Sequence, residues 1–123
     1  MSNQIQNPND KKKFDLGERT AKFGELIIRF AGTLPETPII RPLISQLVRS
    51  GTSVGANYME ADGAESKKDF RHKIGLCKKE SKETMHWLRM IAEADQKEKD
   101  ACRKLWQEAH ELSLIFSSIY KKK

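Results

Sequence analysis

The residues best suited to chemistry are two rows of polar side chains at helical spacing in the middle of the chain. The first row is Gln46, Arg49, Ser53, Asn57 and Glu60, and the second is Lys73, Glu80 and Glu83. Steps of three and four place each row on one face of a helix. If two such helices pack antiparallel, Arg49 pairs with Glu80 or Glu83, and Glu60 pairs with Lys73. We favour this structural interpretation, because paired charges avoid the penalty of several kcal/mol for isolated burial. A ligand or substrate site in the same cluster remains the alternative.

A di-iron centre would need two Glu-x-x-His pairs and two further glutamates on the helices of a bundle. Glu83 and His86 form one such pair. Glu108 and His110 are only two residues apart, and His72 follows an aspartate rather than a glutamate. The sequence therefore predicts no metal site and no cofactor.

Two other kinds of catalytic motif are incomplete. The run GTSVGAN at 51–57 lacks the Gly-Lys-Ser/Thr ending that a phosphate-binding loop needs. No serine or cysteine lies in a recognisable nucleophile elbow. We therefore predict no catalytic residues and a protein that is not an enzyme.

The elements that must position these side chains are four amphipathic segments. Their buried stripes run over Leu16–Leu34, Ile40–Ala61, Phe70–Ile91 and Cys102–Ile119. Pro35 and Pro38 cannot continue a helix, a turn is expected near Asp62, and Ser66 is a good N-cap with Asp69 in the first turn. The pattern predicts an all-α fold, an up-down-up-down antiparallel four-helix bundle over residues 14–120. Residues 1–13 are expected to form a flexible tail and 121–123 a basic tail.

Length and composition agree with one such domain. The chain has 123 residues, of which 37% are hydrophobic and 33% charged, as in soluble helical proteins. No apolar run reaches the roughly 18 residues of a membrane span, and residues 1–10 do not resemble a signal peptide. We therefore expect a cytoplasmic protein. Cys77 and Cys102 would lie well over about 10 Å apart along antiparallel helices, beyond the reach of a disulfide, so both are expected to be buried thiols.

The net charge of +6 comes from the ends of the chain. Three lysines at 11–13 and three at 121–123 account for it, since removing these six from 23 basic residues leaves 17 against 17 acidic ones. Lysine-rich ends are usually solvated, and a phosphate-gripping arm is the alternative.

The two flanks of the third segment differ in kind. Lys67, Arg71, Lys78, Lys82 and Arg89 line up on one flank without an acidic residue among them. Leu76, Trp87 and Met90 stand on the other, so the apolar arc is wider than one bundle core requires. We predict that the first flank contacts nucleic-acid phosphates and that the second packs against another copy of the chain.

The stretch from 46 to 88 resembles the four-helix-bundle proteins encoded in intervening sequences of bacterial large-subunit ribosomal RNA genes. The resemblance rests on Gln46, Arg49, Ser50, Ser53, Asn57, Glu60, Ala61, Ser66, Asp69, Phe70, Lys73, Lys79, Glu80, Glu83, Trp87 and Leu88. It implies a homopentameric ring with no settled activity. The fold is also similar to the basic, pentameric accessory proteins of diversity-generating retroelements, which associate with nucleic acid.

These observations define three hypotheses. The first is a non-enzymatic homo-oligomer, expected to be a pentamer, whose basic flank binds RNA or DNA phosphates. The second is a protein-interaction scaffold that binds no nucleic acid. The third is a metal-dependent or small-molecule enzyme that uses the polar cluster.

Overall fold

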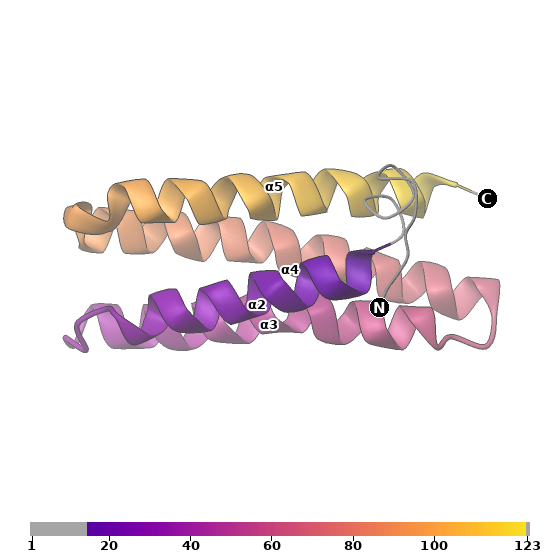
Figure 1. The fold of residues 1–123 in the computed structure, drawn as a ribbon, viewed down its shortest axis with the longest axis horizontal. Helices are drawn as coiled ribbons and strands as arrows, with labels where there is room; N and C mark the ends of the chain where they lie inside the picture. The colour runs from indigo at the N-terminus through magenta and orange to yellow at the C-terminus, as the bar shows by residue number, and fades with distance from the viewer. Residues whose placement is uncertain (1–14, 123) are drawn as a thin grey trace, which may run out of the picture.

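The computed structural model describes residues 15–122. Four long helices follow one another: α2 (Leu16–Gly32), α3 (Ile40–Asp62), α4 (Lys67–Ala94) and α5 (Lys99–Lys121), with a short 3-10 helix η1 (Gln96–Glu98) before α5. They run alternately in opposite directions, side by side (Figure 1). The described part of the chain contains no strand. The predicted four-helix bundle is confirmed.

The helices begin and end where the sequence predicts. The Ser66 side chain accepts a hydrogen bond of 3.0 Å from the Asp69 N–H and caps α4. The Gly63 N–H donates to the Met59 carbonyl oxygen at 3.2 Å and closes α3 just after Asp62. Pro35 and Pro38 lie in the link between α2 and α3, where their rings stop either helix from extending.

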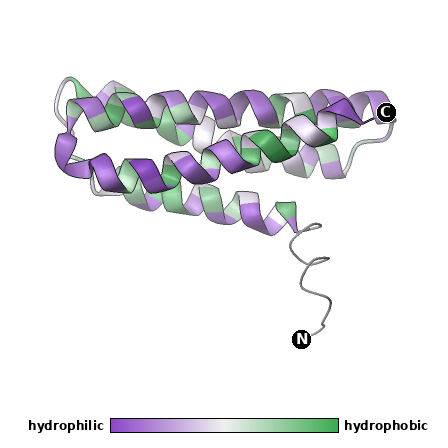
Figure 2. Ribbon diagram, turned by 90° about the horizontal axis from the view of Figure 1, so that it is seen from above, coloured by the Kyte–Doolittle hydropathy of each residue, from purple (hydrophilic) through white to green (hydrophobic). Residues whose placement is uncertain are grey.

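The core runs along the inside of all four helices. The largest fully buried apolar side chains are Phe23, Ile27, Leu47, Ile74, Leu88, Ile91, Leu112 and Phe116. Figure 2 shows hydrophobic and hydrophilic residues alternating along each helix, as amphipathic packing requires. Burying each such side chain contributes roughly 1.5 to 3 kcal/mol, which is the main reason that the bundle forms.

Two glycines let α2 and α3 approach closely. A Cβ atom at Gly51 would lie 2.9 Å from both Cγ atoms of Ile27, and one at Gly55 would lie 3.4 Å from the Thr20 backbone. Glycine inside a helix costs about 1 kcal/mol relative to alanine. The close packing of α2 offsets that cost.

Both cysteines are free and buried, as predicted. Burial raises the pKa of the Cys77 thiol to about 12. It also raises the pKa of Cys102 to about 11, with further contributions from Glu98 and Asp95. Both thiols are therefore protonated at neutral pH, as expected of packing residues.

No helix within residues 15–122 is long and apolar enough to cross a membrane. The predicted N-terminal tail, with its three lysines at 11–13, lies outside the described residues, as does Lys123. Lys121 and Lys122 are exposed at the end of α5.

Candidate functional site

The two polar rows face each other between α3 and α4. Arg49 Nη1 donates to Glu80 Oε1 at 3.2 Å, and Nη2 of the same guanidinium contacts Glu83 Oε2. Farther along, Lys73 Nζ donates to Glu60 Oε1 at 2.7 Å. That hydrogen bond raises the pKa of Lys73. Both ion pairings that the sequence indicates are present.

The remaining polar groups of these rows bond to the helices themselves. Ser53 Oγ donates to the Arg49 carbonyl oxygen at 2.6 Å, and Asn57 Nδ2 donates to the Ser53 carbonyl oxygen at 2.9 Å. Arg49 Nε donates to Gln46 Oε1 at 3.2 Å. Residues 15–122 also hold no group of three or more His, Cys, Asp or Glu side chains that could hold a metal ion. The hydrogen bonds of the cluster therefore connect parts of the bundle to one another.

The flank predicted to meet another copy is partly covered within one chain. Leu76, Trp87 and Met90 are all half-buried. Trp87 packs against the core, and its Nε1–H donates to Glu83 Oε2 at 3.2 Å. More strongly exposed apolar side chains lie on other helices, including Ile28 at 53% and Met59 at 64%. The interface on α4 stays a prediction.

The basic flank of α4 lies on the side that meets α5. Lys67, Arg71, Lys82 and Arg89 are exposed, and Lys78 is half-buried. Arg71 joins the two helices, because its Nε donates to the Tyr120 carbonyl oxygen at 3.0 Å. Its guanidinium carbon also lies 3.9 Å from the centroid of the Tyr120 ring, a cation–π arrangement.

Helix α5 adds its own cations and aromatic rings to this side. Lys99 and Arg103 are exposed near its start. The rings of Trp106 and His110 stack with centroids 5.0 Å apart and planes 29° apart. We use the term α4–α5 basic face for Lys67, Arg71, Lys78, Lys82 and Arg89 of α4 together with Lys99, Arg103, Trp106, His110 and Tyr120 of α5. The sequence of α4 alone does not reveal the second half, although Lys99, Arg103, Trp106 and His110 follow steps of four and three.

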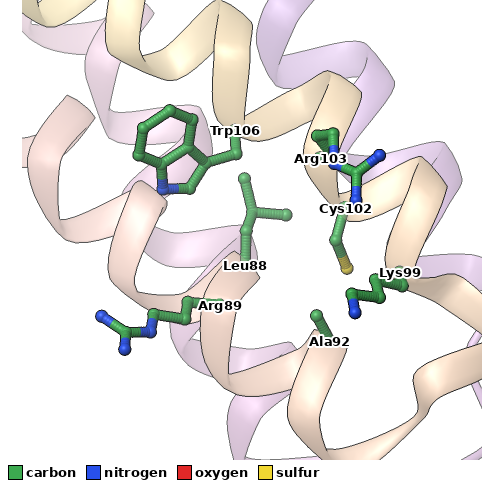
Figure 3. A pocket seen from close by; sticks show the side chains of 7 residues that line it. All are labelled: Leu88, Arg89, Ala92, Lys99, Cys102, Arg103 and Trp106. Carbon is green, nitrogen blue, oxygen red and sulfur yellow. The ribbon is translucent and has the colours of Figure 1, made fainter.

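A hollow of about 190 Å³ opens at the η1 end of this face. It is lined by Leu88, Arg89, Ala92, Lys99, Cys102, Arg103 and Trp106. Figure 3 shows Arg89 on one side of the hollow and Lys99 and Arg103 on the other, with Trp106 above Leu88. The sequence did not predict this hollow, because it depends on which residues of α4 and α5 lie opposite each other.

Four glutamates of the same two helices turn away from this face, whereas the exposed Glu93 lies one turn after Arg89 on α4. Glu80 and Glu83 on α4 face α3, where they meet Arg49. Glu108 and Glu111 on α5 face α2, where both bond to Arg19. Among the cations of the α4–α5 basic face, Arg103 has an acidic partner at 3.6 Å, the largely exposed Asp100. Positive charge is thus concentrated along one side of the bundle.

A family model described as 23S rRNA-intervening sequence protein matches residues 12–118. The chain belongs to this family. A solved structure similar to this 23S rRNA-intervening sequence protein comes from Bacteroides thetaiotaomicron VPI-5482. It is described as a protein of unknown function from the S23 ribosomal protein family. The two share 25% sequence identity and a TM-score of 0.75, over 86% of this chain and 98% of the other. No curated protein matches the chain.

Family membership leaves the site to be interpreted from its own geometry. The polar rows of this 23S rRNA-intervening sequence protein are occupied by contacts within the bundle, as the ion pairs of Arg49 and Lys73 show. The α4–α5 basic face, by contrast, presents exposed cations to solvent. It is therefore the strongest candidate for contact with another molecule.

Proposed function

We propose that this protein is a non-enzymatic, cytoplasmic homo-oligomer that binds the phosphates of RNA or DNA through the α4–α5 basic face. The separation of charge described above is the observation that carries the proposal. Because Glu80 and Glu83 of α4 pair with Arg49, and Glu108 and Glu111 of α5 pair with Arg19, cations on the shared side of these helices keep their attraction for an external polyanion. Neutralising phosphates with lysine and arginine releases counterions from nucleic acid, so binding weakens steeply with salt.

The contacts that the face offers are directed at the backbone of the nucleic acid. Lysine and arginine contacts to phosphates fix position but carry no sequence information. We therefore expect little discrimination between base sequences. The rings of Trp106 and Tyr120 would add sequence-tolerant stacking wherever bases are unpaired.

Charge reversal along α4 tests the proposal. The variant Lys67→Glu/Lys78→Glu/Lys82→Glu changes three cations of the face and spares Arg71, which contacts Tyr120. The matched control Lys22→Glu/Lys79→Glu/Lys104→Glu changes the net charge equally at three exposed lysines outside the face. Fluorescence anisotropy with labelled single-stranded RNA and DNA at low salt should show at least about a tenfold loss of affinity for the first variant only. Equal affinities of the two variants, or no binding by the unchanged protein, would overturn the proposal.

The oligomeric part of the proposal, expected to be a pentamer, is supported by the half-buried flank of Leu76, Trp87 and Met90. Light scattering coupled to size exclusion gives the mass directly. Leu76→Glu/Met90→Glu should reduce the mass to that of one chain. Ile28→Glu/Met59→Glu, on α2 and α3, should leave it unchanged. A monomeric unchanged protein, or dissociation only of the second variant, would contradict an interface on α4.

A protein-interaction scaffold is the second candidate, favoured by the exposed apolar side chains of Ile28 and Met59. These two residues border a hollow of about 270 Å³ between α2 and α3. The candidates differ in one observable. A scaffold has a low affinity for nucleic acid, and that affinity does not depend on the charge of the α4–α5 basic face. The affinity of a phosphate binder falls when that charge is reversed.

A further inference from the structure

The hollow at the η1 end differs from the rest of the α4–α5 basic face. Elsewhere the face offers cations along a ridge, but here it is recessed, with a volume of about 190 Å³. The recess is apolar at its base, because Leu88, Ala92 and Cys102 line it there beside the Trp106 ring. Arg89 of α4 borders it on one side, with its guanidinium directed outward, and Lys99 and Arg103 of α5 border it on the other (Figure 3).

This combination fits one kind of group. An apolar recess beside an aromatic ring accepts a flat, poorly hydrated ring system, and a rim of three cations accepts an anion attached to it. Trp106 already stacks on His110, which fixes the orientation of the indole before a ligand arrives. The volume is below the roughly 300 to 1,000 Å³ of sites for drug-sized ligands. It therefore suits a single base, with its phosphate on the rim.

The hollow also lies where the face ends. Beyond it the chain turns from α4 through η1 into α5 and closes the space between the helices. Asp95 and Glu98 lie at this turn, near enough to Cys102 to contribute to its raised pKa. Repulsion between these carboxylates and further phosphates opposes continuation of a bound strand past the turn, although the exposed Lys97 lies between them.

We propose that the hollow binds the terminal nucleotide of a single-stranded RNA or DNA, with the base against Trp106 and the terminal phosphate among Arg89, Lys99 and Arg103. The inference rests on the proposed function, since the rest of the strand runs along the α4–α5 basic face. A duplex is excluded as the occupant, because its stacked bases offer no free face to the indole.

Protection of the Cys102 thiol from alkylation shows whether a ligand occupies the hollow, and it does not depend on a measurement of affinity. Cys102 is 3% exposed and lines the hollow, whereas Cys77 is fully buried between α3 and α4 and donates to the Val54 carbonyl oxygen. Alkylation of each cysteine is followed by mass spectrometry with a saturating linear octanucleotide and with a circular strand that has no ends. The linear strand should slow alkylation of Cys102 at least fivefold and leave the rate at Cys77 unchanged. The circular strand should protect neither thiol.

Adjacent residues of α5 provide a matched pair of variants. Arg103→Gln removes a cation from the rim, and Lys104→Gln removes one that does not line the hollow. Trp106→Leu keeps apolar bulk but removes the stacking surface. We expect Trp106→Leu to weaken binding of a linear strand at least about fivefold. Arg103→Gln should reduce the preference for a strand with a terminal phosphate over one without, since Arg89 and Lys99 remain, and Lys104→Gln should leave that preference intact.

Three results would overturn the terminal-nucleotide site while leaving the proposed function standing. The first is equal protection of Cys102 by linear and circular strands. The second is that neither strand protects Cys102, although strand binding is weakened by charge reversal at Lys67, Lys78 and Lys82. The third is full protection by a free mononucleotide at the same concentration as the octanucleotide. The last result would assign the hollow to a soluble nucleotide. Failure of every strand to bind would overturn both proposals.

Discussion

The guanidinium of Arg19 on α2 forms a two-point contact with the carboxylate of Glu108 on α5, with Nε–Oε2 and Nη2–Oε1 distances of 2.8 and 2.9 Å. A third bond of 2.7 Å joins Nη2 to Glu111. These contacts hold the first described helix to the last, and the bond to Glu108 raises the pKa of Arg19 above its usual range.

Replacing Arg19 should destabilise the protein measurably. Both Arg19 and Glu108 are only about one quarter to one third exposed, at 25% and 30%, so Arg19→Met leaves a partly buried carboxylate without its partner. We expect a loss of about 1 to 3 kcal/mol in the free energy of unfolding by urea. Arg29→Met is the control. Its pair with Glu25 spans 3.9 Å and is largely exposed, so its loss should stay below about 0.5 kcal/mol. Equal losses would contradict this ranking.

Alanine at Gly51 should destabilise the bundle although alanine favours helices. Its Cβ would lie 2.9 Å from Ile27, and such overpacking costs about 1 to 3 kcal/mol. Gly17→Ala is the matched comparison, because the nearest atom to its Cβ is 3.9 Å away on Tyr58. That change should be neutral or stabilising by up to about 1 kcal/mol. Thermal unfolding midpoints of the two variants test this expectation. A Gly51→Ala protein that is more stable than the unchanged protein would show that α2 and α3 separate readily.

Replacing Arg49 should lower the stability of the protein without changing its binding of RNA, because the polar rows have a structural role. Arg49→Met leaves Glu80 and Glu83 facing each other without a cation, so we expect about 1 to 2 kcal/mol less stability. Binding of single-stranded RNA should not change, because these carboxylates lie on the α3 side of α4. A variant of unchanged stability with altered ligand binding would favour a ligand site in the cluster.

The salt dependence of the nucleic-acid binding constant should report how many phosphates contact the protein. For single strands the slope of log K against log salt is about −0.7 per phosphate neutralised. Full engagement of the five cations on α4 therefore corresponds to a slope of about −3.5. Lys78→Gln/Lys82→Gln should make that slope less steep by about 1.4. A slope that these changes do not alter would place the contacts elsewhere.

Stability should fall at alkaline pH through the buried thiols. The pKa of Cys77 is raised from 9.0 to about 12 on folding, so above pH 9 the unfolded chain loses a proton that the folded chain keeps. The contribution of this thiol is complete below pH 9 and declines as pH rises towards 12. Urea midpoints measured from pH 8 to 10 should fall less for Cys77→Ala than for the unchanged protein. Parallel curves would show that the thiol does not titrate differently in the two states.

Much of the fold follows from local patterns. Steps of three and four define the helices, Pro35 and Pro38 end one of them, and Ser66 begins another. The pairing of Arg49 with Glu80 was predictable because consecutive antiparallel helices are neighbours. The contact of Arg19 with Glu108 was not, since it spans 89 residues and depends on the rotation of α2 and α5 about their axes.

The candidate site was predictable only in part, for the same reason. The cations of α4 form a visible stripe in the sequence. The contribution of α5 depends on its register against α4, which no single segment specifies. Trp106 reads equally well as a core residue until the hollow beside Arg89 and Arg103 is seen.

The even number of long helices within residues 15–122 has a practical consequence for engineering. The start of α2 and the end of α5 lie towards the same end of the bundle, and the hollow lies towards the other (Figure 1). A flexible linker of about ten residues could join these two ends, with new termini opened in the link at 33–39. Such a circular permutant would keep α3, α4 and α5 as one continuous segment. Fluorophores or affinity handles attached at residues 15 or 122 would likewise lie at the end of the bundle opposite the hollow.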